Sequence, residues 1–238
     1  MSDIKRTTLG DLVAEIPARS RVFEKFALDY CCGGQRTLEA ACAQKGISAE
    51  QVIAELDALG SEARPPEVDW RSQPLDRLVD HIEQTHHVFL RREMPRVAEL
   101  AAKVAMVHGE NHPELLQVTQ IYSDFQDEMF AHLSKEENVL FPLMRAIASG
   151  QGPGGFHCGS VTNPIRVMLA EHDSAGLALG ILRKLTGNFT PPPDACGSYL
   201  ALLDGLASIE ADTHQHIHVE NNILFPKAVG DEQENCTA

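Results

Sequence analysis

The chain has 238 residues, of which 43% are apolar, so it can bury a substantial core in one large domain or in a medium and a small one. Its net charge of −14 argues against nucleic acid or an anionic membrane surface as the main partner. We find no apolar stretch of signal-peptide length at the start and no run approaching the ~20 apolar residues of a membrane span, so we expect a cytoplasmic protein with reduced cysteines.

The spacing of the apolar residues predicts an all-α protein, because they recur every three or four positions and strand-like alternation is missing. Residues 1–62 are expected to form a small helical domain around a Cys-Cys-Gly-Gly break. Within it, Ser48 followed by Gln51 marks the start of a helix. Residues 63–73 are charged and rich in proline, which is typical of a linker.

Four longer helices are predicted in the rest of the chain, over residues 74–106, 113–148, 164–186 and 195–229. Proline stands at or near the start of the first three, where its missing N–H costs little. Short connections such as HGENH and GNFTPPPD join two of the helix pairs, and a Gly-rich stretch of unknown role at 149–163 joins the two hairpins. This pattern predicts an antiparallel four-helix bundle over residues 74–230, with a tail over 231–238.

An internal repeat lies within the bundle. The stretch HLSKEENVLFP recurs 84 residues later as HIHVENNILFP, with six of eleven positions identical. His132 and Glu136 in the first copy correspond to His216 and Glu220 in the second. A spacing of four places each pair on one face of its helix, within the apolar stripe that must face the bundle interior.

Two single histidines complete the pattern. His172 interrupts the apolar stripe of the third helix, and a histidine 85 residues earlier, His87, does so on the first helix, although periodicity alone does not decide between His86 and His87. Two hairpins related by a pseudo-twofold axis would bring four imidazoles and two carboxylates to one level. That set suits two divalent metals with both glutamates and one oxygen as bridges, which leaves each metal a position for a small ligand.

A structural role for these residues is the main alternative. A single His-x-x-x-Glu spacing is most often a surface pair or a satisfied core histidine, but two copies in register, each followed by Leu-Phe-Pro, favour a metal site because a buried carboxylate is costly without a partner. His214 and His218 lie off the stripe and are expected on a solvated face. His81 is expected to be structural or exposed.

His108 shares the stripe of His87 but lies 21 residues further on, which is ~31 Å along a straight helix. It can reach the same metals only if Pro95 turns the chain back or the helix ends early.

The motifs DYCCGG at 29–34 and DWRS at 69–72, together with the histidine and glutamate series that ends in LFP, closely resemble the Repair of Iron Centres family over almost the whole chain. The resemblance implies a hemerythrin-like bundle behind a small ScdA-type domain, with an oxo-bridged, non-haem di-iron centre. It also implies a role in restoring iron–sulfur clusters damaged by nitric oxide or peroxide. The family pattern places the ligands at His87, His132, Glu136, His172, His216 and Glu220. It also includes a histidine that matches His108.

The vicinal pair Cys31–Cys32 matches the N-terminal motif of the same family. A disulfide between neighbours closes a strained ring, so a permanent bridge is not expected. A redox, metal-transfer or nitrosyl-accepting role for the pair competes with a packing role. The other cysteines considered, Cys42, Cys196 and Cys236, have no partner pattern and are expected to be inert.

Four functions compete on the sequence. The first is cluster repair by iron donation or nitric oxide handling, with damaged iron–sulfur proteins or cluster-assembly machinery as partners. The second is a protein that traps nitric oxide or oxygen, and the third is a nitric oxide reductase whose electrons come from elsewhere, since the sequence has no flavin or nicotinamide motif. The fourth is a helical interaction module without metal. The sequence leaves the oligomeric state open, including a homodimer.

Overall fold

A computed structural model describes residues 4–60, 65–150 and 160–237. Their regular structure is helical apart from one isolated antiparallel bridge between Thr8 and Thr37, so the predicted all-α class is confirmed. Part of the expected linker, most of the Gly-rich connection at 149–163 and the side chain of Cys236 lie outside the described residues. None of the described helices is long and apolar enough to cross a membrane.

The N-terminal part consists of short helices around the Cys-Cys-Gly-Gly turn. They are η1 (Ile4–Arg6), α1 (Leu9–Glu15), α2 (Arg19–Lys25), α3 (Leu38–Lys45) and α4 (Ala49–Ala58). Side-chain caps fix where three of them begin. Thr8, Thr37 and Ser48 each accept a hydrogen bond from a backbone N–H in the first turn of α1, α3 and α4. The predicted cap at Ser48 is therefore present.

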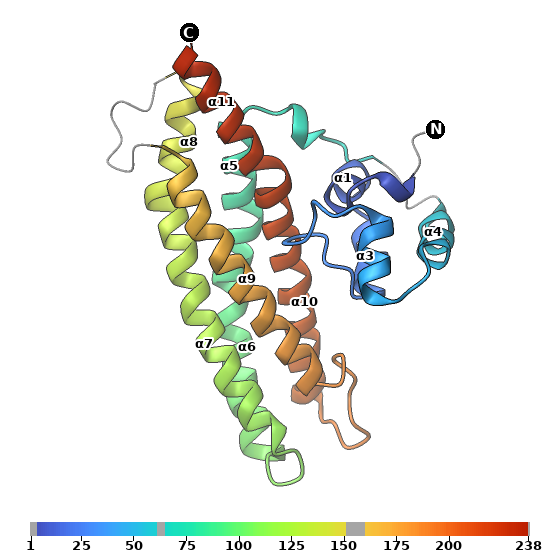
Figure 1. The fold of residues 1–238 in the computed structure, drawn as a ribbon. Helices are drawn as coiled ribbons and strands as arrows, with labels where there is room; N and C mark the ends of the chain where they lie inside the picture. The colour runs from blue at the N-terminus through green and yellow to red at the C-terminus, as the bar shows by residue number, and fades with distance from the viewer. Residues whose placement is uncertain (1–3, 61–64, 151–159, 238) are drawn as a thin grey trace.

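The four predicted long helices form an antiparallel bundle (Figure 1). The first comprises α5 (Leu75–Ile82), the π-helical turn η4 (Glu83–His87) and α6 (Val88–His108). The second comprises α7 (Glu114–Lys135), the π-helical turn η5 (Glu136–Leu140) and α8 (Phe141–Ala148). The third is α9 (Thr162–Leu185), and the fourth comprises α10 (Gly197–Val219), the π-helical turn η7 (Glu220–Leu224) and α11 (Phe225–Thr237). The last helix thus continues through most of the residues expected to form a tail. A short turn, η3 (Trp70–Ser72), precedes the bundle.

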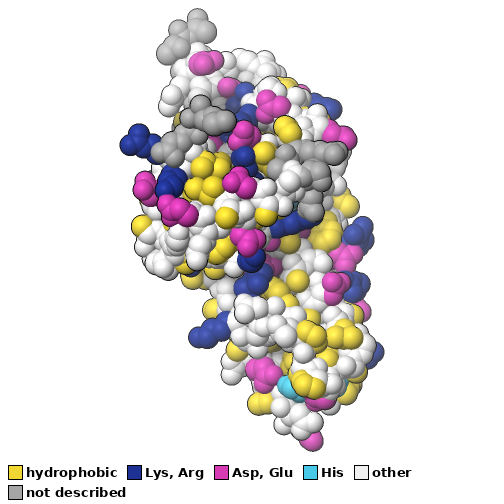
Figure 2. All heavy atoms as spheres, turned by 90° about the vertical axis from the view of Figure 1, so that its right-hand side faces the viewer, with side chains coloured by type: hydrophobic (Ala, Val, Ile, Leu, Met, Phe, Trp, Pro, Cys, Tyr) yellow, Lys and Arg dark blue, Asp and Glu magenta, His cyan; other side chains and the backbone are white. Residues whose placement is uncertain are grey.

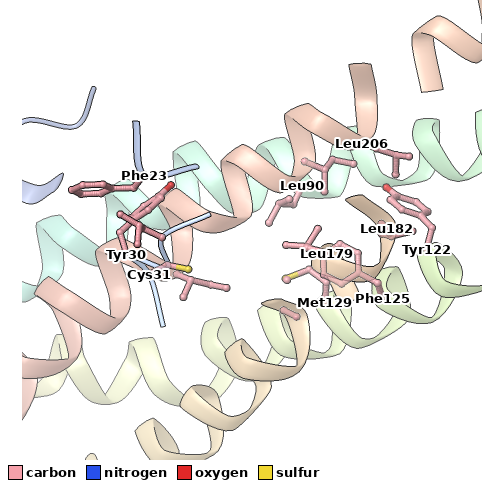
Figure 3. Close-up of a cluster of buried hydrophobic side chains, with 14 of the residues drawn as sticks. Phe23, Tyr30, Cys31, Leu90, Tyr122, Phe125, Met129, Leu179, Leu182 and Leu206 are labelled. Atoms are coloured by element: carbon pink, nitrogen blue, oxygen red, sulfur yellow. The ribbon is translucent and has the colours of Figure 1, made fainter. Parts of the chain in front are cut away.

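Helix α6 packs against both α7 and α10, and α9 closes the bundle on α7 and α10. Pro95 lies inside α6 without reversing the chain, so the helix continues to His108. Large apolar side chains fill the interior in two clusters. One joins α5, α8 and α11 with the start of α9, and the other joins α6, α7, the rest of α9 and α10 and continues into the N-terminal part. In Figure 3, Leu90, Met129 and Leu179 point toward one another from three different helices. Fully burying such a side chain stabilises the fold by roughly 1.5–3 kcal/mol.

The N-terminal part docks on the fourth bundle helix beside η7 (Figure 1). The side-chain amide of Asn222 donates to the carbonyl oxygens of Tyr30 (3.3 Å) and Cys31 (3.1 Å). Gly34 lies against this amide and against the Tyr30 carbonyl, and a Cβ atom there would come within 2.5 Å of that oxygen. A residue without a side chain is therefore needed at the contact.

The surface on the N-terminal side carries side chains of both signs, scattered among apolar and neutral ones (Figure 2). The face in view shows no continuous basic patch, in keeping with the acidic composition.

Candidate metal centre

The six ligands that the sequence predicts, to which His108 was an additional candidate, meet at one level of the bundle. They come from four helices, and each is at most 3% exposed. They divide into two groups whose ligand atoms lie within 4.8 Å of one another. The first group is His87, Glu136, His216 and Glu220, and the second is His132, Glu136, His172 and Glu220. Each group has its own two histidines, and both groups share the same two glutamates.

The two carboxylates span the two groups. Glu136 places Oε2 3.3 Å from His87 Nε2 and Oε1 3.3 Å from His132 Nε2. Glu220 does the same, with Oε1 3.1 Å from His216 Nε2 and Oε2 3.1 Å from His172 Nε2. Each glutamate therefore directs one oxygen at each half of the site.

Local helix geometry helps to place these side chains. The three π-helical turns coincide with predicted ligands: η4 ends at His87, η5 begins at Glu136 and η7 begins at Glu220. Proline follows η5 and η7 as Pro142 and Pro226. Because proline cannot donate to the carbonyl four residues back, a wider turn just before it accommodates the missing bond. The repeated Leu-Phe-Pro is the sequence signal for these turns.

Three of the four imidazoles have a side-chain oxygen within hydrogen-bond distance of Nδ1, the ring nitrogen that points away from the glutamates. His87 Nδ1 lies 2.9 Å from Glu137 Oε1, His132 Nδ1 lies 2.9 Å from Glu171 Oε2, and His172 Nδ1 lies 2.8 Å from Asn221 Oδ1. A partner at Nδ1 fixes the ring and leaves Nε2 free for a metal. Sequence reasoning missed these partners, although each is adjacent in sequence to a predicted ligand.

The residues that contact Nδ1 of the imidazoles do not follow the pseudo-twofold symmetry of the repeat. Glu137 and Asn221 occupy equivalent positions of the repeat, so a carboxylate supports His87 where an amide supports His172. The position equivalent to Glu171 is His86, whose ring stacks on that of His216 with the centroids 5.5 Å apart. His216 Nδ1 has no hydrogen-bond partner among the described residues.

The two buried carboxylates draw positive charge to the site. Burial and Glu220 act to raise the pKa of Glu136, but His132 and His87 outweigh them and lower it. Burial acts to lower the pKa of His132, yet the carboxylates of Glu136 and Glu220 raise it to about 9. Burial lowers the pKa of His216 well below its ordinary value. Two ionised carboxylates thus lie in the interior and attract positive charge from protons or a metal.

The donor atoms of the site suit divalent metal ions. Both oxygens of Glu136 and of Glu220 are buried and accept no hydrogen bond from the described residues, despite their short distances to imidazole nitrogens. Buried polar atoms left in this state are costly unless an ion binds them. A set of imidazoles and carboxylates suits iron, manganese or zinc. The residues present therefore fit the metal pair that the resemblance implies.

A pocket of about 560 Å³ between α7 and α9 leads to one half of the site. His132 and His172 line it together with apolar side chains that include Met129 and Ala175. The ion pair between Lys135 and Glu171 lies beside the same pocket. A small molecule can therefore approach the His132 and His172 half from this side.

The remaining histidines show where the expectations hold and where one fails. His87, not His86, joins the cluster, and His86 instead places Nδ1 3.0 Å from Asp212 Oδ1. His218 is only 2% exposed and lies near the Tyr30 ring, so the expectation of a solvated face is wrong for it, because the N-terminal part covers this side of α10. His214, also expected there, is partly buried beside Tyr30. His81 is stacked on Trp70 at 3.8 Å, a structural role.

His108 is at the other end of α6, so the structure does not bring it to the cluster. Its Nε2 lies 3.2 Å from the Cys196 thiol, which is exposed. His108 lowers the pKa of that thiol to about 7. Cys196 therefore has a partner that the sequence did not reveal, because His108 is 88 positions away in the chain. Cys42 is buried, and burial raises its pKa.

Comparison with known proteins gives matches in both parts of the chain. Residues 5–60 match a domain of unknown function called ScdA_N, and residues 77–228 match the hemerythrin HHE cation binding domain. The iron–sulfur cluster repair proteins YtfE of Escherichia coli O17:K52:H18 (strain UMN026 / ExPEC) and of Escherichia coli O157:H7 are each 39% identical over 224 residues. The aligned region covers 94% of this chain and 97% of each relative.

Proposed function

Because the chain belongs to the family of the iron–sulfur cluster repair protein YtfE, with its hemerythrin cation-binding domain, we propose that it binds two iron ions and takes part in the repair of damaged iron–sulfur clusters. The six clustered side chains would hold the two irons. The damage is nitrosative or oxidative, and the repair proceeds by iron donation or by handling of nitric oxide.

The observation that carries the proposal is the span of the two carboxylates. Glu136 and Glu220 each direct one oxygen at each pair of histidines, which is the arrangement that two ions sharing bridging ligands require. A single structural zinc ion needs only four ligands, so it would not account for four imidazoles and two carboxylates at one level.

The residues of the protein would bind the metals, orient the ligand rings and keep water away from the site. The four histidines would hold the metals, and Glu137, Glu171 and Asn221 fix three of the rings. Bound irons would supply exchangeable positions for small ligands and change of oxidation state. The apolar clusters on either side exclude water along the bundle axis, so exchange with solvent is directed to the pocket beside His132.

The proposal is tested by mixing the iron-loaded protein with an iron–sulfur enzyme whose cluster has been damaged by nitric oxide. We expect recovered enzyme activity above that given by an equal amount of free iron. A Glu136→Ala variant and a Glu220→Ala variant should each lose the magnetic coupling between the irons, seen by Mössbauer spectroscopy. Recovery no greater than with free iron argues against repair, and about zero iron per chain after expression in iron-replete medium argues against the metal site itself.

A second function, trapping of nitric oxide, is supported by the pocket at His132 and His172. On this reading, nitric oxide should change the optical spectrum stoichiometrically and tightly, and no iron should be lost. Iron release on addition of nitric oxide would favour donation instead. Catalytic formation of nitrous oxide with an added electron donor would establish reduction as the activity.

A further inference from the structure

A second group of metal-ligating side chains lies outside the bundle interior, at the turn after α2. The side chains of Asp29, Cys31 and Cys32 place one ligand atom each within 4.8 Å of the others. The two sulfurs are 4.0 Å apart, and Cys31 Sγ lies 3.4 Å from Asp29 Oδ1. Both thiols are free.

These distances are those that one ion would impose. With metal–sulfur bonds of about 2.3 Å and metal–oxygen bonds of about 2.1 Å at tetrahedral angles, two sulfurs are ~3.8 Å apart and a sulfur and an oxygen are ~3.6 Å apart. The observed 4.0 Å and 3.4 Å differ from these values by only a few tenths of an ångström. Two of the three distances within the group therefore already match those around one ion.

The turn itself is held in this form. Asp29 Oδ1 accepts a hydrogen bond from the backbone N–H of Cys32 at 2.9 Å, which fixes the carboxylate beside the two thiols. The carbonyl of Cys31 accepts from Asn222 on the bundle at 3.1 Å. These backbone contacts of Cys31 and Cys32 position the two thiols without involving the sulfur atoms. Asp29 Oδ1 has two roles, because it accepts the Cys32 N–H and is also a candidate ligand.

The site is open on one side. A pocket of about 570 Å³, lined by all three residues together with Asp173 and His214, lies between the N-terminal part and α9 and α10. In Figure 3, Cys31 lies beside Tyr30 and Phe23 at the edge of the apolar cluster. Cys31 is 6% exposed, whereas Cys32 is partly exposed. A cation can thus reach the three ligands through the pocket.

The ligand types favour a cation here. The carboxylate of Asp29 lies beside the two thiols, and a metal that binds thiols displaces their protons. Thiolate ligands combined with one carboxylate suit a thiophilic divalent ion such as zinc or ferrous iron.

One amide connects this turn to the metal centre. Asn221 donates from Nδ2 to the Cys31 carbonyl at 3.4 Å and places Oδ1 2.8 Å from Nδ1 of the predicted ligand His172. We propose that Asp29, Cys31 and Cys32 form a second, transient site for a thiophilic divalent cation, through which ferrous iron passes between the bundle and an acceptor. The transfer step rests on the proposed function, whereas the site itself does not.

Cobalt(II) is the probe that tests the site, because only thiolate ligands give an intense sulfur-to-cobalt charge-transfer band and the bundle centre has none. Titration of the full chain should give this band with about one equivalent per chain. A Cys31→Ser/Cys32→Ser variant should lose it, and Asp29→Asn, which retains the acceptor for the Cys32 N–H, should weaken cobalt binding at least tenfold. A Cys42→Ser/Cys196→Ser variant is the matched control and should retain the band.

Folding of each variant is checked by circular dichroism. Protection of Cys31 and Cys32 from alkylation by added zinc, in the unaltered chain, gives a measurement that needs no variant. A missing band, a band that survives in Cys31→Ser/Cys32→Ser, or thiols that zinc leaves unprotected would each overturn the site.

The transfer step has its own measurement, the rate at which a chelator removes iron from the loaded protein. We expect this rate to fall several-fold in Cys31→Ser/Cys32→Ser, and an unchanged rate would overturn the transfer role. Failure of the proposed function is measured separately. In that case the Glu136→Ala/Glu220→Ala variant would bind as much iron as the unaltered chain, and this result does not depend on the cobalt band at the thiols.

Discussion

His172 Nδ1 lies 2.8 Å from Asn221 Oδ1, whereas the equivalent ring in the first hairpin, His87, is held by the carboxylate of Glu137. The repeat is thus symmetric in its predicted ligands and asymmetric in their support. An ionised carboxylate at Nδ1 makes an imidazole a stronger donor than a neutral amide does. The two metal positions are therefore expected to differ in affinity, since His132 and His172 both have a partner at Nδ1, whereas His216 has none among the described residues.

Replacing Asn221 with alanine tests this support. We expect Asn221→Ala to weaken binding of one metal of the pair by about 10–100-fold, because His172 loses the contact that orients its ring. Competition with a chelator measures the change. Asn138→Ala is the control, since the side-chain amide of Asn138 donates to Ser134 in its own helix and Asn138 occupies the position of the repeat next to that of Asn221. Equal metal loss in both variants would contradict the role of Asn221.

Metal content distinguishes His108 from the clustered histidines. His108→Ala should still hold two irons per chain, because this residue contacts Cys196 at the far end of α6. His172→Ala should lose at least one iron. The measurement is iron per chain after identical loading of both variants. A loss of iron in His108→Ala would contradict the conclusion that His108 is too far from the cluster to be a ligand.

The same histidine should control the reactivity of Cys196. Because His108 lowers the pKa of the thiol to about 7, the thiolate predominates above that pH. The rate of alkylation at Cys196, followed by peptide mass spectrometry, should therefore reach half its maximum near pH 7. In His108→Ala the midpoint should rise toward about 8.5, the ordinary value for a thiol. Buried Cys42 should react slowly in both proteins. A midpoint that does not move would exclude His108 as the cause.

An ion pair between α9 and α10 should contribute to stability. Arg183 contacts both oxygens of Glu210, whose side chain is nearly fully buried. Arg183→Leu should lower the free energy of unfolding by about 2 kcal/mol, since it leaves a buried carboxylate unpaired while the arginine itself was partly solvated. The double variant Arg183→Leu/Glu210→Leu should recover most of the loss. Chemical denaturation measures both, and Lys25→Met, which removes the exposed pair with Glu55, should change little.

Docking of the N-terminal part depends on Gly34. A methyl group there would collide with the Tyr30 carbonyl and with Asn222, so Gly34→Ala should cost about 1–3 kcal/mol and expose residues 29–36 to hydrogen exchange. Gly176→Ala in α9 is the control, because a Cβ atom there meets nothing within 4 Å. Unchanged exchange in Gly34→Ala would mean that the contact is not needed for docking.

Much of the bundle follows from local sequence. Apolar residues at three-and-four spacing define which face of a helix is buried. A glutamate on that face, four residues after a histidine, needs a partner because a buried carboxylate is costly. That argument brings His132, Glu136, His216 and Glu220 to one level, which is where they lie in the bundle. The Leu-Phe-Pro that follows each pair marks the π-helical turns, which periodicity alone does not predict.

Other assignments needed contacts between distant segments. Periodicity could not separate His86 from His87, because the π-helical turn η4 shifts the register at this point. It placed His218 in solvent, since nothing in α10 records that the N-terminal part covers it. The pairing of His108 with Cys196 and the hydrogen bond from Asn221 to the Cys31 carbonyl likewise join residues 88 and 190 positions apart.

The sequence by itself determined the helices, their buried faces and the ligand types, because these depend on side-chain chemistry and on spacing within one helix turn. Only the tertiary structure decided which oxygen faces which nitrogen, what supports each ring and where the cysteine pair lies. Those outcomes depend on the rotation and stagger of one helix against another, which the packing of the whole core sets.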